Sequence, residues 1–207
     1  TALWEQGVTV DTVTPHADLD GYDLVVVPTL YLVDDDGAAN VARAARRGAT
    51  VVVTFFSGIV DTHDHVRLGG YPGAFRDLLG LRTEEFYPLQ ADETVRVTGK
   101  AVGGDATADL WTEQTHGPDG TEGVAAYDDG ALTGHPAVTR RDVGTGAAWY
   151  VGTRLDRAGL ASLVGRLVEE SGVAPDVVAP AGLEIVRRRS VDGATSFAGV
   201  HPLGNGN

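Results

Sequence analysis

The chain has 207 residues, which is enough for one domain with its own hydrophobic core and a part of a second. It has no cysteine, which excludes disulfide bonds, thiolate metal sites and cysteine nucleophiles. The formal net charge of −13 opposes contact with a phosphate backbone, and no apolar run approaches the roughly 20 residues that cross a bilayer. We therefore expect no nucleic-acid partner, no membrane partner and a cytoplasmic location.

The first third of the chain carries the pattern of strands around one helix. Val8–Val13 alternates apolar and polar residues, as a strand does. Asp23–Val27 and Thr50–Phe56 hold continuous apolar runs, which are typical of parallel strands buried on both faces. Between these runs, Asp34 is placed to cap a helix that Gly48 ends. Two strands joined by a helix through short connections predict a right-handed crossover unit.

The rest of the main domain reads as short segments separated by turn residues, followed by a second helix. Pro72–Leu79 predicts a short helix that Gly80 closes. A long helix is expected between Asp156 and Gly172, with leucine and valine at helical spacing. Five strands are expected between the two helices, namely Val95–Val97, Ala108–Thr112, Gly123–Tyr127, Val138–Asp142 and Ala147–Val151.

The two ends of the chain are expected to be parts of larger units. Thr1–Gly7 predicts the last turns of a helix with a glycine cap. Ala174–Pro180 has the proline content of a linker, and Leu183–Arg189 predicts one further strand. The glycine-rich residues after it are either the start of a second domain or a tail.

Two patterns contain residue types that catalysis uses. The pairs Glu84-Glu85 and Glu169-Glu170 consist of adjacent residues, whose side chains diverge on a strand or a helix, so solvated charge is expected. Ser57 follows a buried run, where a hydrolase of suitable fold places its nucleophile, but FFSGI lacks the first glycine of that turn. Ser57 is therefore either a nucleophile or the start of a turn with Gly58, and we expect the turn.

The segment Asp61-Thr62-His63-Asp64-His65 has the residue types of a metal site. In an extended chain His63 and His65 lie on one side, and imidazole and carboxylate both suit zinc or manganese. The same segment also suits a surface or interface loop. We expect the loop, and we expect no metal and no cofactor.

Aromatic residues and prolines gather around the short helix, in loops that are long for a compact domain. Such residues serve either an interface or a local core beneath the loop. The three tryptophans, Trp4, Trp111 and Trp149, are expected in the core.

Four segments together resemble one known family. They read LWEQGVTVDTV (Leu3–Val13), YDLVVVPTLYLV (Tyr22–Val33), TFFSGIVDTHDHVRLGGYPGAFRDLLG (Thr54–Gly80) and EEFYPL (Glu84–Leu89). In this order and spacing they resemble the middle, or trimerisation, domain of glycoside hydrolase family 42 β-galactosidases. The resemblance covers roughly residues 1–172, and GLEIVRRR (Gly182–Arg189) resembles the opening strand of that family's small C-terminal β domain.

The resemblance implies a fold and a division of the chain. The fold is α/β, an open and mostly parallel sheet with helices on both faces, similar to class I glutamine amidotransferases and flavodoxin. Residues 1–175 would be the trimerisation domain without its first strand, and residues 176–207 a linker with a fragment of the C-terminal β domain.

The resemblance also implies a non-catalytic role for this chain. In that family a (β/α)₈ barrel, absent from this sequence, hydrolyses terminal β-D-galactosides with retention, and the middle domain assembles a homotrimer. The expected partners are that barrel and two further copies. The expected contact region comprises Ser57, Gly58, Asp61, His63, His65, Gly69, Gly70, Tyr71, Pro72, Phe75, Phe86 and Tyr87. An independent hydrolase that uses Ser57 and a small-molecule binding module at the carboxyl ends of the sheet remain as alternatives.

Overall fold

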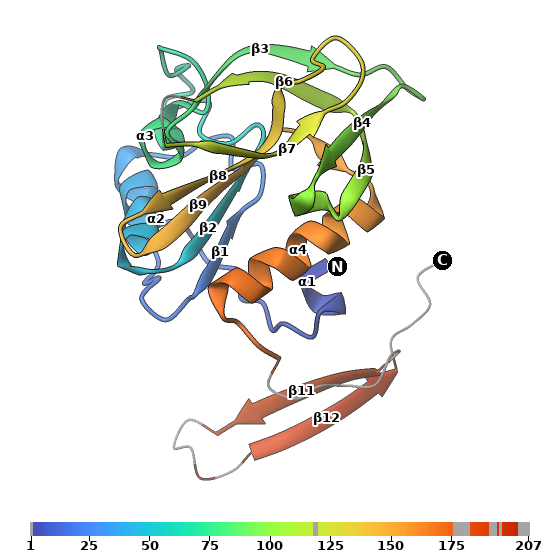
Figure 1. Ribbon diagram of the computed structural model, residues 1–207. Helices are drawn as coiled ribbons and strands as arrows, with labels where there is room; N and C mark the ends of the chain where they lie inside the picture. Colours follow the sequence, from blue (N-terminus) through green and yellow to red (C-terminus); the bar gives the residue numbers. More distant parts are fainter. Residues whose placement is uncertain (1, 118–119, 176–182, 191–193, 195, 203–207) are drawn as a thin grey trace.

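The computed structural model describes residues 2–117, 120–175, 183–190, 194 and 196–202. Its main element is an open, curved sheet of eight strands in the order β1-β2-β9-β8-β7-β4-β5-β10, flanked by helices (Figure 1). In that order the strands are Leu24–Val27, Thr50–Thr54, Gly146–Val151, Pro136–Val143, Glu122–Tyr127, Thr94–Gly99, Gly104–Asp109 and Arg154–Leu155.

The sheet is mixed, so the prediction of a mostly parallel sheet is wrong. Strand β2 pairs in parallel with β1 and with β9. The other five neighbouring pairs are antiparallel. The reason is the connections: a helix crosses over between β1 and β2, whereas β8 and β9, like β4 and β5, follow each other through short turns, which produce antiparallel neighbours.

Two capped helices flank the sheet, as predicted. Helix α2 (Asp35–Arg47) begins after Asp34, whose carboxylate accepts a hydrogen bond of 2.8 Å from the Gly37 amide. Helix α4 (Arg157–Ser171) begins after Asp156, which accepts a bond of 2.7 Å from Gly159. Both helices end at a glycine with positive φ.

The two helices pack on opposite faces of the sheet, because successive side chains of a strand point to opposite sides. Val52 and Trp149 belong to the core on the α4 side, together with Leu163 and Leu167 of that helix. Val51, Val53, Ala148 and Tyr150 belong to the core on the α2 side. The continuous apolar run of β2 is thus explained by burial on both faces.

A second sheet of two strands, which the sequence did not reveal, lies over one end of the first (Figure 1). Strand β3 (Arg82–Pro88) pairs with β6 (Trp111–His116). The strand expected over Ala108–Thr112 is therefore two strands, because Leu110 has φ 65° and turns the chain from β5 into β6. Before β3 lie a short 3₁₀ turn, η1 (Gly73–Phe75), and α3 (Arg76–Leu79), which Gly80 closes as expected. A further 3₁₀ turn, η2 (Lys100–Val102), joins β4 to β5.

The N-terminal region differs from expectation in two respects. After α1 (Ala2–Glu5), residues 8–13 form no strand: Val8 is buried, but Val10 and Val13 are 56% and 46% exposed. Alternation makes a strand only where another strand pairs with it, and none of the described strands pairs with residues 8–13. Trp4 is 39% exposed rather than in the core, whereas Trp149 is fully buried as predicted.

The C-terminal strand is confirmed and has a partner. Strand β11 (Leu183–Arg189) pairs antiparallel with β12 (Ser196–Pro202) in a separate two-stranded sheet. Most of the predicted linker, residues 176–180, lies outside the described residues. Among the described residues, no helix is long and apolar enough to span a bilayer.

Candidate functional site

The most distinctive surface of the domain is a group of aromatic rings where β1, β2, β3 and β6 meet. We call this group the aromatic surface and define it by six residues. They are Tyr31, Phe55, Phe56, Tyr71, Phe86 and Trp111. Tyr31 follows β1, the two phenylalanines at 55 and 56 follow β2, and the other rings come from β3, β6 and the loop before η1. The fold therefore joins residues that are up to 80 positions apart in the chain.

The rings pack against one another rather than into the main core. Phe86 stacks on Tyr71 with centroids 4.6 Å apart and lies 5.0 Å from Trp111. Phe56 meets the edge of Trp111 at 4.7 Å and stacks with Tyr31 at 6.0 Å. Offset and edge contacts at such distances stabilise aromatic clusters beyond their buried area.

Much of this cluster remains accessible in the single chain. Tyr31 is 41% exposed, and the other five rings are half-buried. Beside it, Leu32 and Val66 flank Val60 in a small ladder and are 44% and 52% exposed. Leu68, further along the same loop, is 87% exposed. Contiguous exposed apolar groups of this kind mark an interaction surface more often than a free surface.

A buried carboxyl group lies directly beneath the aromatic surface. Glu113 on β6 is only 1% exposed. Its Oε2 accepts hydrogen bonds from Tyr150 at 2.5 Å and from Thr83 at 3.2 Å, and its Oε1 accepts one of 2.8 Å from the Trp111 indole. The Glu113 backbone amide donates to the Tyr127 hydroxyl at 3.3 Å. One carboxyl group thus ties the aromatic surface to the central strand β9.

Burial changes the proton affinity of this cluster. Removal from water raises the pKa of Glu113 to about 7, and the hydrogen bonds from Tyr150, Trp111 and Thr83 offset only part of that rise. Burial also raises the pKa of Tyr150 well above its ordinary value, and the neighbouring carboxyl group adds to the rise. Sequence analysis missed Glu113. The available signal was a glutamate that shares a strand face with Trp111 and Thr115, directly after the strand predicted over Ala108–Thr112.

The expected contact residues divide into buried and accessible groups. Ser57 and Phe75 are 0% exposed, so both are packed inside the chain. Pro72 is buried as well, whereas Tyr71 and Phe86 are half-buried and Tyr87 is 36% exposed.

The loop from Gly58 to Gly70 is ordered by specific contacts. Gly58 has φ 65°, and a Cβ there would come within 2.9 Å of Ala74. The Arg76 guanidinium donates to the carbonyls of Leu68, Gly69 and Gly70. The glycines therefore permit a tight path that a neighbouring cation holds in place.

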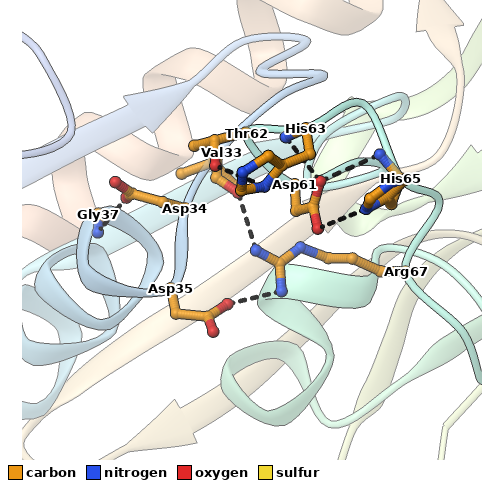
Figure 2. Close-up of polar contacts among 9 residues, drawn as sticks. All are labelled: Val33, Asp34, Asp35, Gly37, Asp61, Thr62, His63, His65 and Arg67. Atoms are coloured by element: carbon orange, nitrogen blue, oxygen red, sulfur yellow. Dashed lines mark hydrogen bonds and ion pairs between the residues drawn. The ribbon is translucent and has the colours of Figure 1, made fainter.

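The same loop brings together three of the residues whose types suit a metal site. Asp61, His63 and His65 offer one ligand atom each, all within 4.8 Å of one another (Figure 2). Asp61 is half-buried and both histidines are exposed. Thr62 and Asp64 are not part of this group.

The expected alternatives for catalysis find no support in the geometry. The Ser57 hydroxyl is buried, accepts a bond of 3.1 Å from the Leu30 amide and donates to the Val27 carbonyl, so it serves the turn rather than a substrate. Glu84 pairs with Arg82 and His116, and Glu170 pairs with Arg140. Both glutamates are thus engaged in partly exposed ion pairs.

Together these features define a class, a mixed α/β domain that presents a partly exposed aromatic surface. Residues 1–174 match the family described as the β-galactosidase trimerisation domain. The chain therefore belongs to the β-galactosidase trimerisation domain family.

Relatives and solved structures agree with this membership. A β-galactosidase from Arthrobacter sp. is 54% identical over 94% of this chain and 27% of its own length. β-Galactosidase LacZ from Heyndrickxia coagulans is 39% identical over 91% of this chain and 28% of its own length.

The fold itself is found in solved β-galactosidases. The crystal structure from Bacillus circulans sp. alkalophilus matches with a TM-score of 0.88 and 33% identity, over 95% of this chain and 29% of that one. The β-galactosidase from Rahnella sp. R3 matches with the same TM-score and identity, over 98% and 30% of the two chains. The chain thus spans less than a third of the length of these relatives.

Proposed function

We propose that this chain is the non-catalytic assembly region of a retaining β-galactosidase and that it holds a homotrimer together. The observation that carries the proposal is the aromatic surface, whose rings come from several strand ends and remain half-exposed in the single chain. Aromatic residues are enriched in the cores of protein interfaces. The family membership of residues 1–174 supports the same role.

The partner of the aromatic surface is a second copy of the chain. Three copies related by a three-fold axis make a closed ring in which each interface joins two different patches, so the surface need not be self-complementary. The other side of the contact is expected among the exposed apolar residues of the loop between β2 and η1, such as Val66 and Leu68. A catalytic barrel elsewhere in the full-length enzyme is the rival occupant.

The chemistry of the full enzyme would reside outside these residues. The β-galactosidase names of the relatives suggest terminal β-D-galactosides as substrates, and a catalytic barrel as a second partner in the same chain. The similarity of the fold to amidotransferases and flavodoxin, the division at residue 175 and the cytoplasmic location remain predictions.

The solution mass of the chain tests this proposal. Light scattering after size exclusion, over a range of protein concentrations, should give three times the 21.6 kDa of one chain. A mass of one chain at every concentration would contradict the claim that these residues hold the trimer, and would favour the barrel as the occupant of the surface.

A further inference from the structure

We propose that Asp61, His63 and His65 form a binding site for a late first-row divalent metal ion of the zinc type. This inference goes beyond the role in assembly and does not depend on it. It starts from two imidazoles and one carboxylate, a set of ligands that zinc, cobalt and nickel accept readily.

The three side chains converge on a turn within the loop (Figure 2). Their ligand atoms all lie within 4.8 Å of one another. Nδ1 of His65 is 3.5 Å from Oδ2 of Asp61, and the two imidazole rings stack with centroids 5.8 Å apart. A tight turn, in which the Asp64 amide donates to the Asp61 carbonyl, brings the three side chains together.

Backbone hydrogen bonds hold the carboxylate in position before any ion arrives. Oδ1 of Asp61 accepts bonds from the amides of His63 at 2.8 Å and His65 at 3.0 Å. The Asp61 amide in turn donates to the His65 carbonyl at 3.0 Å. At the base of this turn, Val60 bridges to both Leu32 and Val66, which ties the loop to the body of the domain. One carboxylate oxygen is thus committed to the turn, and Oδ2 faces the His65 imidazole.

The local charges favour a bound cation. The Asp61 carboxylate contributes a negative charge to the two imidazoles, and its Oδ2 lies 3.5 Å from Nδ1 of His65. The nearest arginine in the loop does not compete for it: Arg67 donates to Asp35 at 2.6 Å and to the Val33 carbonyl at 2.8 Å (Figure 2). The carboxylate therefore remains available to a metal ion.

Only a small contraction separates this arrangement from a coordination sphere. Ligand atoms around a tetrahedral zinc ion lie about 3.4 Å apart, given bonds of about 2.1 Å. The pair formed by His65 and Asp61 is already at 3.5 Å. The His65 side chain is 77% exposed, so its ring can turn without disturbing the core. Three protein ligands leave one position for water or for a group from a neighbouring molecule.

The test is a metal titration of the 207-residue chain, prepared without any histidine tag. Cobalt(II) is added to metal-free protein, and the visible absorption of tetrahedral cobalt is followed until it saturates. One equivalent should bind, and zinc should then displace the cobalt and abolish the band. Magnesium should leave the band unchanged, because it prefers all-oxygen octahedral sites.

Three variants test whether these residues are the metal ligands, and a fourth variant serves as the matched control. His63→Gln, His65→Gln and Asp61→Asn should each weaken binding at least about ten-fold, the low end of what loss of even an outer partner costs at metal sites. Asparagine preserves the oxygen that accepts the two amides. His16→Gln removes an exposed histidine that contacts a single carboxylate, Asp34, at 3.1 Å, and should bind like the unchanged chain.

Two results would overturn the proposal. One is the absence of a saturable cobalt band in the unchanged chain. The other is binding by the His63→Gln and His65→Gln variants that is as tight as that of the unchanged chain, with far-UV circular dichroism confirming that both remain folded. The two histidine substitutions decide the question even where Asp61→Asn alters the turn.

Discussion

The domain has two cores of different chemistry, one on each side of strand β9. On the α4 side, Trp149 is fully buried among aliphatic side chains such as Leu163 and Leu167. On the other side, the next residue, Tyr150, reaches with its hydroxyl to the buried Glu113. The first core is packed mainly from apolar side chains, whereas the second also contains a hydrogen-bonded network around Glu113 whose members must all be satisfied. The comparison indicates where stability is insensitive to pH and where it is not.

The apolar core should give the largest loss of stability on truncation. Trp149→Ala leaves a large cavity in a packed region and should lower the free energy of unfolding by about 3–5 kcal/mol. Tyr31→Ala, at a ring that is 41% exposed, should cost less than about 1 kcal/mol. Urea unfolding of both variants at low protein concentration measures the difference. Equal losses would mean that the aromatic surface is part of the core.

The polar core should respond to pH in a defined window. An ordinary glutamate loses its proton near pH 4.5, whereas folded Glu113 holds it to about pH 7. Between these values the folded state binds more protons than the unfolded state, so rising pH destabilises the fold. The stability that protonated Glu113 contributes is fully present below pH 4.5 and is lost as the pH rises through about 7. This difference in pKa between the folded and the unfolded state corresponds to roughly 3 kcal/mol in the free energy of unfolding.

Glu113→Gln isolates this effect because the amide has nearly the same shape and does not titrate. The difference in unfolding free energy between the two proteins should shift by roughly 3 kcal/mol from pH 4.5 to pH 7.5, in favour of the variant at the higher pH. Urea titrations at the two values measure it. A difference that does not change with pH would show that Glu113 is not the titrating group.

The junction between α2 and β9 tests packing at a smaller scale. A Cβ at Gly146 would lie 2.3 Å from the Ala49 carbonyl oxygen and 2.4 Å from that of Ala45. Gly146→Ala should therefore cost about 1–3 kcal/mol, since the backbone must shift. Gly21→Ala is the control, because nothing lies within 4 Å of its Cβ position. Similar midpoints in thermal unfolding for both variants would contradict the close contact.

The helices and strands around the apolar core were predicted well, because the sequence signals that mark them are local. Asp34 and Gly48, Asp156 and Gly172 mark the helix ends that the structure has. The apolar runs before Pro28 and after Ala49 predicted two strands correctly, and β2 is buried as expected. Strand β1 lies at the edge of the sheet instead, and its Val26 is 40% exposed. Caps and apolar periodicity act within a few residues, so they can be read without knowledge of the fold.

The polar core could not be predicted in the same way, because the residues that contact each other in it are far apart in the sequence. The bond between Tyr150 and Glu113 joins residues 37 positions apart, and β3 pairs with a strand that begins only at Trp111. Leu110, with φ 65°, divides a segment that alternation predicted to be a single strand. The prediction of mostly parallel strands was wrong for a related reason. Whether neighbouring strands run parallel or antiparallel depends on how they are connected, and several of these short strands follow each other through turns.

The candidate contact surface was predicted in part. The resemblance and the aromatic composition pointed to the region from Ser57 to Tyr87, and the structure places Tyr71 and Phe86 in one cluster there. Composition alone could not separate these rings from Phe75, which is fully buried. It also could not supply Tyr31 and Trp111, which reach the cluster from other strands.

The most direct test of the central claim compares two surfaces of the same chain. The double variant Tyr31→Ala/Tyr71→Ala truncates rings of the aromatic surface, and Leu160→Ala truncates a leucine of α4 that is equally exposed at 41%. Light scattering should give a trimer for Leu160→Ala and for the unchanged chain, and a monomer for the double variant. A trimer of unchanged stability in the double variant would contradict the assignment of assembly to the aromatic surface.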